Sequence, residues 1–179
     1  MNINKKYIPF AHAKSIYDIS VIFFKKLGIK TVLVDLDNTL DSYKALEPNK
    51  NALDLKAKLE AFGIKLIILS NNRKKRVAPY ANKLGVEYRN SIGKPFTKKL
   101  LKFIKEKNLN IDETILVGDQ LLTDVLMANK IGLKVILTEK IVKEDQWTTR
   151  FNRIREKGKR KKLHKLKLLK DWSEYLCQN

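Results

Sequence analysis

The 179-residue sequence has a single cysteine, Cys177. One cysteine cannot form a disulfide within the chain or supply a cysteine-rich zinc cluster, so a reducing compartment is expected. The sequence also lacks a long apolar run near its N-terminus, since the longest, residues 19–24, includes Ser20 and is too short to cross a bilayer. Lys14 and Asp18 argue against a signal peptide in this region. Together these absences predict a cytoplasmic protein with no transmembrane segment.

Acidic residues are scarce beside basic ones: 19 against 38, for a formal net charge of +19. Residues 150–170 hold 11 Lys and Arg and one acid, Glu156. Such a surface attracts nucleic acid, anionic lipid or phosphorylated substrates without choosing among them. Three leucines in the segment are spaced as a short apolar stripe, which suits a peripheral position on a membrane. We therefore keep three alternatives for residues 150–170: an anionic membrane surface, nucleic acid, or a solvated basic helix without a partner.

Patterns of buried strands alternate with helical patterns along most of the chain. Strands are predicted at 31–34, 64–69, 86–88, 114–117 and 133–137, and helices at 49–62, 73–84, 96–107 and 121–130. Pro79 predicts a break within its helix, and Pro95 is expected at the first helical position of the next one. Strands separated by helices of this length are typical of an α/β fold with a parallel sheet and helices on both faces.

The domain organisation expected from these patterns is simple. Residues 1–157 form one domain, in which residues 1–30 are an N-terminal helical segment that packs on the rest. Residues 158–179 form a basic C-terminal tail.

Polar side chains suited to phosphate chemistry follow several of the predicted strands. Because the carboxyl ends of parallel strands meet at one edge of a sheet, these side chains should converge in one crevice. Two carboxylates as close in sequence as Asp35 and Asp37 repel each other unless a cation offsets their charge. The converging set is Asp35, Asp37, Ser70, Lys94, Asp119 and Asp124.

Four motifs in this order resemble those of the haloacid dehalogenase (HAD) superfamily. They are Asp-Leu-Asp-Asn-Thr at 35–39, Ser-Asn-Asn at 70–72, Lys94 within Gly-Lys-Pro, and Gly-Asp-Gln-Leu-Leu-Thr-Asp at 118–124. Flanking residues 15–19, 28–30 and 147–153 are similar to the YqeG-like phosphatase branch of subfamily IIIA, which is related to phosphatidylglycerophosphate phosphatases. The resemblance implies a three-layer HAD-like Rossmannoid fold and a phosphoric monoester hydrolase.

The resemblance also implies a catalytic pair and a metal site. Asp35 would be the nucleophile that forms an aspartyl-phosphate, and Asp37 the general acid and then the base. Mg²⁺ would be held by Asp35, by the main-chain carbonyl of Asp37 and by Asp119, all through oxygen ligands that suit this ion.

The remaining motif residues would act on phosphate or support the site. Ser70, Lys94 and the main-chain amide of Asn71 would bind the transferring phosphoryl group. Thr39 is expected to bond the main chain near the nucleophile. Asp124 either orients Lys94 through a salt bridge, which we favour, or binds Mg²⁺ through water.

The spacing of the motifs predicts an uncapped site. Asp37 and Ser70 are 33 positions apart, and Ser70 and Lys94 are 24 apart, which leaves no room for a large inserted cap domain. An open site suits a bulky substrate or a lipid headgroup such as phosphatidylglycerophosphate. The alternative is a basic HAD-fold protein that associates with nucleic acid or ribosomes and has weak or vestigial phosphatase activity.

Overall fold

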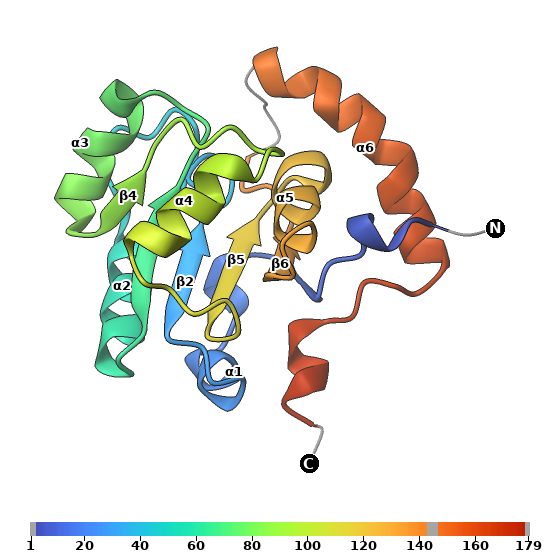
Figure 1. The fold of residues 1–179 in the computed structure, drawn as a ribbon, viewed down its shortest axis with the longest axis horizontal. Helices are drawn as coiled ribbons and strands as arrows, with labels where there is room; N and C mark the ends of the chain where they lie inside the picture. The colour runs from blue at the N-terminus through green and yellow to red at the C-terminus, as the bar shows by residue number, and fades with distance from the viewer. Residues whose placement is uncertain (1–2, 143–146, 178–179) are drawn as a thin grey trace.

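The computed structural model describes residues 3–142 and 147–177, with the main chain alone for 147–153. Within these residues, six parallel strands form one sheet in the order β1-β6-β5-β2-β3-β4 (Figure 1). The strands are β1 (Ala11–Ala13), β2 (Thr31–Val34), β3 (Lys65–Leu69), β4 (Glu87–Arg89), β5 (Thr114–Gly118) and β6 (Lys134–Thr138). The predicted α/β fold with a parallel sheet is confirmed, and the chain between the motifs forms no inserted cap domain.

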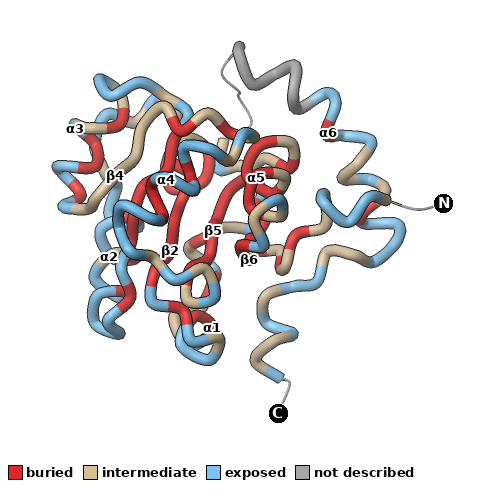
Figure 2. Tube along the Cα trace, viewed as in Figure 1, coloured by how far each residue is buried: buried red, intermediate tan, exposed pale blue. Residues whose placement is uncertain are grey.

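Helices cover both faces of the sheet and make three layers. On one face α1 (Val21–Lys26), α2 (Lys50–Ala61) and α3 (Lys74–Leu84) share an apolar cluster with alternate strand residues such as Val32 and Val34. On the other, α4 (Lys98–Glu106) and α5 (Leu126–Asn129) pack with the intervening residues such as Leu33. All four residues of β2 are buried because both faces of the sheet are covered (Figure 2).

Proline positions differ from the sequence-based expectation in two helices. Pro79 is exposed and lies inside α3, which continues through it without a break. Pro95 does not begin a helix, because the N–H of Phe96 bonds the carbonyl of Gly93 in a turn and α4 begins only at Lys98. The predicted helix at 121–130 is present, but its first part is η3 (Leu121–Val125), a π-helical turn.

The N-terminal segment is not only helical. Besides η1 (Lys5–Tyr7), η2 (Ile16–Asp18) and α1, it contributes β1, which pairs with β6 and extends the sheet. Ala11 and Ala13 are fully buried there. The strand was not predicted because Ala-His-Ala lacks the β-branched residues that mark the other strands.

The C-terminal residues pack on the domain rather than extend from it. The expected boundary between residues 157 and 158 falls inside α6 (Trp147–Lys165), whose Leu163 is fully buried. After this helix, the N–H of His12 bonds the carbonyl of Lys170, and Tyr175 of η4 (Trp172–Tyr175) stacks on Phe10 with ring centres 4.6 Å apart. None of the helices in the described residues is long and apolar enough to cross a membrane.

Candidate active site

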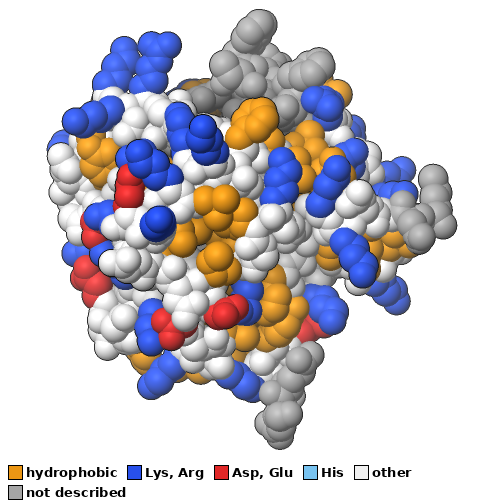
Figure 3. Space-filling view, in the orientation of Figure 1, with side chains coloured by type: hydrophobic (Ala, Val, Ile, Leu, Met, Phe, Trp, Pro, Cys, Tyr) orange, Lys and Arg blue, Asp and Glu red, His pale blue; other side chains and the backbone are white. Residues whose placement is uncertain are grey.

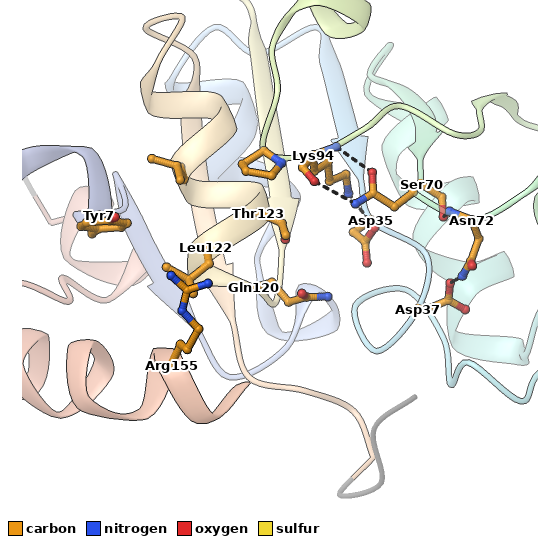
Figure 4. A pocket seen from close by; sticks show the side chains of 13 residues that line it. Tyr7, Asp35, Asp37, Ser70, Asn72, Lys94, Gln120, Leu122, Thr123 and Arg155 are labelled. Carbon is orange, nitrogen blue, oxygen red and sulfur yellow. Dashed lines mark hydrogen bonds and ion pairs between the residues drawn. The ribbon is translucent and has the colours of Figure 1, made fainter. Parts of the chain in front are cut away.

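The predicted motif residues meet at the carboxyl ends of β2, β3 and β5. A cavity of about 520 Å³ opens there (Figure 4). Five of the residues that the motifs predicted line it: Asp35, Asp37, Ser70, Asn71 and Lys94. Tyr7, Pro95, Leu126 and Arg155 line it as well. Its other lining residues are Asn72, Gln120, Leu122 and Thr123.

Lys94 lies at the floor of the cavity between two carboxylates. Its Nζ is 2.6 Å from Asp35 Oδ1 and 2.7 Å from Asp124 Oδ1, and the side chain is almost fully buried. Burial opposes the ammonium charge, but Asp124 and Asp35 together raise the pKa of Lys94 above its usual value. Lys94 therefore stays protonated. Asp124 forms a salt bridge with Lys94, the first of the two roles that the sequence suggested for it.

Three buried carboxylates form a cluster beside this lysine. Oxygen atoms of Asp35, Asp119 and Asp124 all lie within 4.8 Å of one another. Burial raises the pKa of Asp35 well above its usual range; Lys94 opposes this rise, while Asp124 and Asp119 add to it. Lys94 offsets one of the three carboxylate charges, so a divalent cation with a preference for oxygen ligands would balance the cluster. The cluster could hold a metal ion.

Thr39 supports this cluster directly. Its Oγ1 donates to Asp119 Oδ1 at 3.3 Å, instead of bonding the main chain near the nucleophile as expected. The chain turns sharply after β2, with Asn38 at a φ of 66° and its N–H bonded to the carbonyl of Asp41 at 2.6 Å. This turn brings Thr39 back toward the end of the neighbouring strand β5, where Asp119 begins the next loop.

The carboxylate of Asp37 lies apart from the cluster. Asn72 Nδ2 donates to its Oδ2 at 2.5 Å (Figure 4). Arg76 Nη2 donates to its Oδ1 at 2.9 Å. Burial raises the pKa of Asp37, and Arg76 and Asn72 oppose this rise. Arg76 was missed in the sequence, although its place in the first turn of α3, four residues after Asn72, could have indicated it.

The Ser-Asn-Asn segment lines one side of the cavity and holds the loop that carries Lys94. Ser70 is buried, and its Oγ accepts from the N–H of Asn72 at 3.0 Å. The side chain of Asn71 bonds both main-chain groups of Lys94, accepting from its N–H at 2.7 Å and donating to its carbonyl at 3.2 Å. Asn71 thus fixes the loop that carries Lys94, and phosphate binding by its amide stays a prediction.

Helix α6 contributes residues that the sequence did not indicate. Glu156, almost fully buried, accepts from the N–H of Leu122 at 2.8 Å. Arg160 donates to the carbonyl of Asp119 and pairs with Glu139. The only sequence signal was Glu156 itself, the one acid in a basic segment. The predicted signature at 147–153 lies outside the residues whose side chains are described.

Position 118 must be glycine, because the side chain of Asp124 lies directly against its Cα. A Cβ at position 118 would overlap the carboxyl group of Asp124, which lies directly against the glycine. Gly118→Ala is therefore expected to displace Asp124 and its ion pair with Lys94, lowering kcat on an aryl phosphate by about tenfold or more. Gly158→Ala, where a Cβ meets no atom within 4 Å, is the matched control. Equal activity of both variants and wild type would contradict this account.

Comparison with known proteins agrees with this geometry. The family model described as "Mitochondrial PGP phosphatase" matches residues 1–142. The Bacillus subtilis protein named "Probable phosphatase YqeG" is 31% identical over 151 residues, which are 84% of this chain and 88% of that protein.

Two solved structures share the fold. A Legionella pneumophila protein described as a "putative HAD superfamily (subfamily III A) hydrolase" has a TM-score of 0.50 and 23% identity, covering 67% of this chain and 71% of its own. An uncharacterized protein of Listeria monocytogenes has a TM-score of 0.53 and 18% identity, covering 65% of this chain and 85% of its own. The family model and the Bacillus subtilis relative show that the chain belongs to the mitochondrial PGP phosphatase family and is a phosphatase, and its four HAD-like motifs are gathered around a buried aspartate cluster.

Proposed function

We propose that the protein is a Mg²⁺-dependent phosphomonoester hydrolase in which Asp35 is the nucleophile. The observation that carries the proposal is the position of Asp35, which lines the cavity, contacts Lys94 at 2.6 Å and belongs to a cluster of three buried carboxylates. A carboxylate held beside a fixed ammonium group and a candidate cation site is placed to attack an anionic phosphoryl group.

The metal ion fits the donor set of the cluster. Asp35 and Asp119 offer hard oxygen ligands, and Asp124 is near enough to join them or to act through Lys94. The main-chain carbonyl of Asp37 would complete this set. When bound, Mg²⁺ neutralises the phosphoryl oxygens and so permits attack by a carboxylate.

The reaction follows from the placement of the side chains. An oxygen of Asp35 bonds to phosphorus while the ester P–O bond breaks, and Lys94 and Ser70 stabilise the phosphoryl charge. The leaving oxygen takes a proton from Asp37, and burial raises the pKa of this carboxyl group, which is the direction that suits a general acid. Asp37 then accepts a proton from the water that attacks phosphorus, which releases inorganic phosphate and restores Asp35.

For Asp37 this role requires a small movement. Asn72 and Arg76 hold its carboxylate in the structure, so the side chain must turn toward the leaving oxygen when substrate enters. The free energy of binding the rest of the substrate would offset the loss of these two hydrogen bonds.

The proposed substrate is the terminal phosphate of a bulky lipid headgroup such as phosphatidylglycerophosphate. Support comes from the family to which the chain belongs and from the absence of an inserted cap in the described residues. Exposed apolar side chains also adjoin two lining residues: Phe96 follows Pro95, and Ile154 precedes Arg155. Figure 3 shows apolar patches exposed among Lys and Arg side chains on one face of the molecule. We accordingly propose a cytoplasmic protein that acts at the surface of an anionic membrane.

A substrate panel tests this proposal. Phosphatidylglycerophosphate in mixed micelles, nucleoside monophosphates and sugar phosphates are compared by phosphate release in Mg²⁺. We expect the lipid to have the highest kcat/KM, by about tenfold or more, because the uncapped cavity leaves its headgroup accessible. A preference for a nucleotide or a sugar phosphate would contradict the lipid assignment and leave the phosphatase chemistry intact.

A further inference from the structure

A second cavity adjoins the active-site cavity on its α6 side. It has a volume of about 400 Å³ and shares Tyr7 and Arg155 with the first cavity. Lys159 and Lys162 of α6 line the second cavity but not the first. Figure 4 shows Tyr7 and Arg155 on the side of the active site away from Asp37. A substrate bound at Asp35 could therefore extend past Arg155 toward further positive charge.

The charge of Arg155 is not used within the described part of the chain. There, Arg155 forms no ion pair or hydrogen bond, whereas Arg76 binds Asp37 and Arg160 binds Glu139. Arg155 belongs to none of the four motifs, and its side chain is exposed to the cavity. A guanidinium group at the mouth of a phosphatase site, without a carboxylate partner, is suited to bind an anion that enters with the substrate.

Contacts of neighbouring residues hold this part of α6 against the domain. The next residue, Glu156, is buried and bonded to the N–H of Leu122, which itself lines the active-site cavity. One turn further along α6, Lys159 Nζ lies 5.0 Å from the centre of the Tyr7 ring. Arg155 and Lys159 are four residues apart and so lie on the same side of the helix. The two cations form a basic track that leads out of the active site.

We propose that Arg155, with Lys159 beyond it, binds a second anionic group carried by the leaving group, whose chain crosses the cavity from the leaving oxygen beside Asp37 to Arg155 (Figure 4). The enzyme then prefers phosphomonoesters whose leaving group itself carries a negative charge. This inference rests on the proposed function, because the first phosphate must be the one transferred to Asp35. It goes further by assigning selectivity for the leaving group to α6, a helix outside the HAD motifs.

Matched pairs of small substrates test the role of Arg155. The bisphosphates of short alkane diols carry a second anion, and the monophosphates of the same diols do not. The measured quantity is the ratio of kcat/KM for each bisphosphate to kcat/KM for its monophosphate, in Mg²⁺, for the full-length protein. We expect Arg155→Gln to lower this ratio by about 10-fold to 100-fold, the usual value of a charge-assisted hydrogen-bonded contact.

Three further variants define the control set. Arg155→Lys should recover part of the ratio, because it keeps the charge but loses the planar pair of donors. Lys159→Gln should lower the ratio more for longer diols than for shorter ones, since Lys159 lines only the outer cavity. Lys157→Gln removes an exposed charge from the same helix, lines neither cavity and should leave the ratio unchanged.

Two kinds of result would overturn the inference. An unchanged ratio in Arg155→Gln would show that Arg155 does not bind the leaving group. An equal fall in the Lys157→Gln control would show the same, because the overall positive charge of α6 would then account for the preference. If wild type hydrolyses neither substrate class in Mg²⁺, the proposed function fails together with the inference. Hydrolysis of both classes with no change in the ratio refutes the role of Arg155 alone.

Discussion

Asp35→Asn is expected to abolish hydrolysis of an aryl phosphate while the protein stays folded. The amide has no charged oxygen to attack phosphorus, so kcat should fall by about 10³-fold or more. Stability should be unchanged or higher in the absence of metal, because Asp35 is buried beside two other carboxylates and Lys94 keeps its ion pair with Asp124. Initial rates and a thermal unfolding curve measure the two effects.

A surface aspartate provides the control for this variant. Asp54 is exposed on α2 and lines no part of the active-site cavity, so Asp54→Asn should keep wild-type activity. Residual activity of Asp35→Asn within about tenfold of wild type would exclude Asp35 as the nucleophile. A large drop in melting temperature would instead mean that Asp35 is needed for folding, contrary to the expectation from its electrostatic surroundings.

Removal of divalent metal is expected to have the second large effect. EDTA should abolish phosphate release, and added Mg²⁺ should restore it, because the carboxylate cluster carries more negative charge than Lys94 offsets. Binding should also stabilise the fold: at a concentration about 100 times the Kd, Mg²⁺ adds about 2.7 kcal/mol to the free energy of unfolding. Calorimetry with and without Mg²⁺ measures this second effect independently of activity.

Asp119 distinguishes a specific metal site from general ionic effects. Asp119→Asn should remove most of the stabilisation by Mg²⁺, because Asp119 belongs to the cluster and accepts a hydrogen bond from Thr39. Asp112→Asn, an exposed substitution, should keep it. Full activity in EDTA, or equal stabilisation of the Asp119 variant and wild type, would contradict the metal site.

Strand ends could be predicted from the sequence because the pattern that marks a buried strand also locates its carboxyl end. Asp35, Ser70 and Asp119 each follow such a run, and parallel pairing then brings them to one edge of the sheet. Lys94 follows no predicted strand, and it was predicted to join the site because Gly93-Lys94-Pro95 comes just before a predicted helix. Its buried position between Asp35 and Asp124 is a property of the folded chain.

Residues whose positions depend on packing between distant elements could not be predicted. Arg155 and Glu156 reach the site because α6 returns to the end of β5, and the only local signal of that return is Glu156 itself, the one acid in a run of lysines and arginines. The orientation of Asp37 depends in the same way on Arg76 of α3. Strand β1 was missed because its pairing with β6 joins segments more than 120 residues apart.

The most direct test of the central claim is chemical trapping of the phosphorylated carboxylate. The protein is mixed with an aryl phosphate and Mg²⁺, quenched in acid during turnover and treated with borohydride, which reduces an aspartyl-phosphate to homoserine. Peptide mass spectrometry then locates the modified residue. We predict homoserine at position 35, dependent on both substrate and Mg²⁺ and missing from Asp35→Asn. Steady hydrolysis with an unmodified Asp35, or with the modification at another carboxylate, would contradict the account.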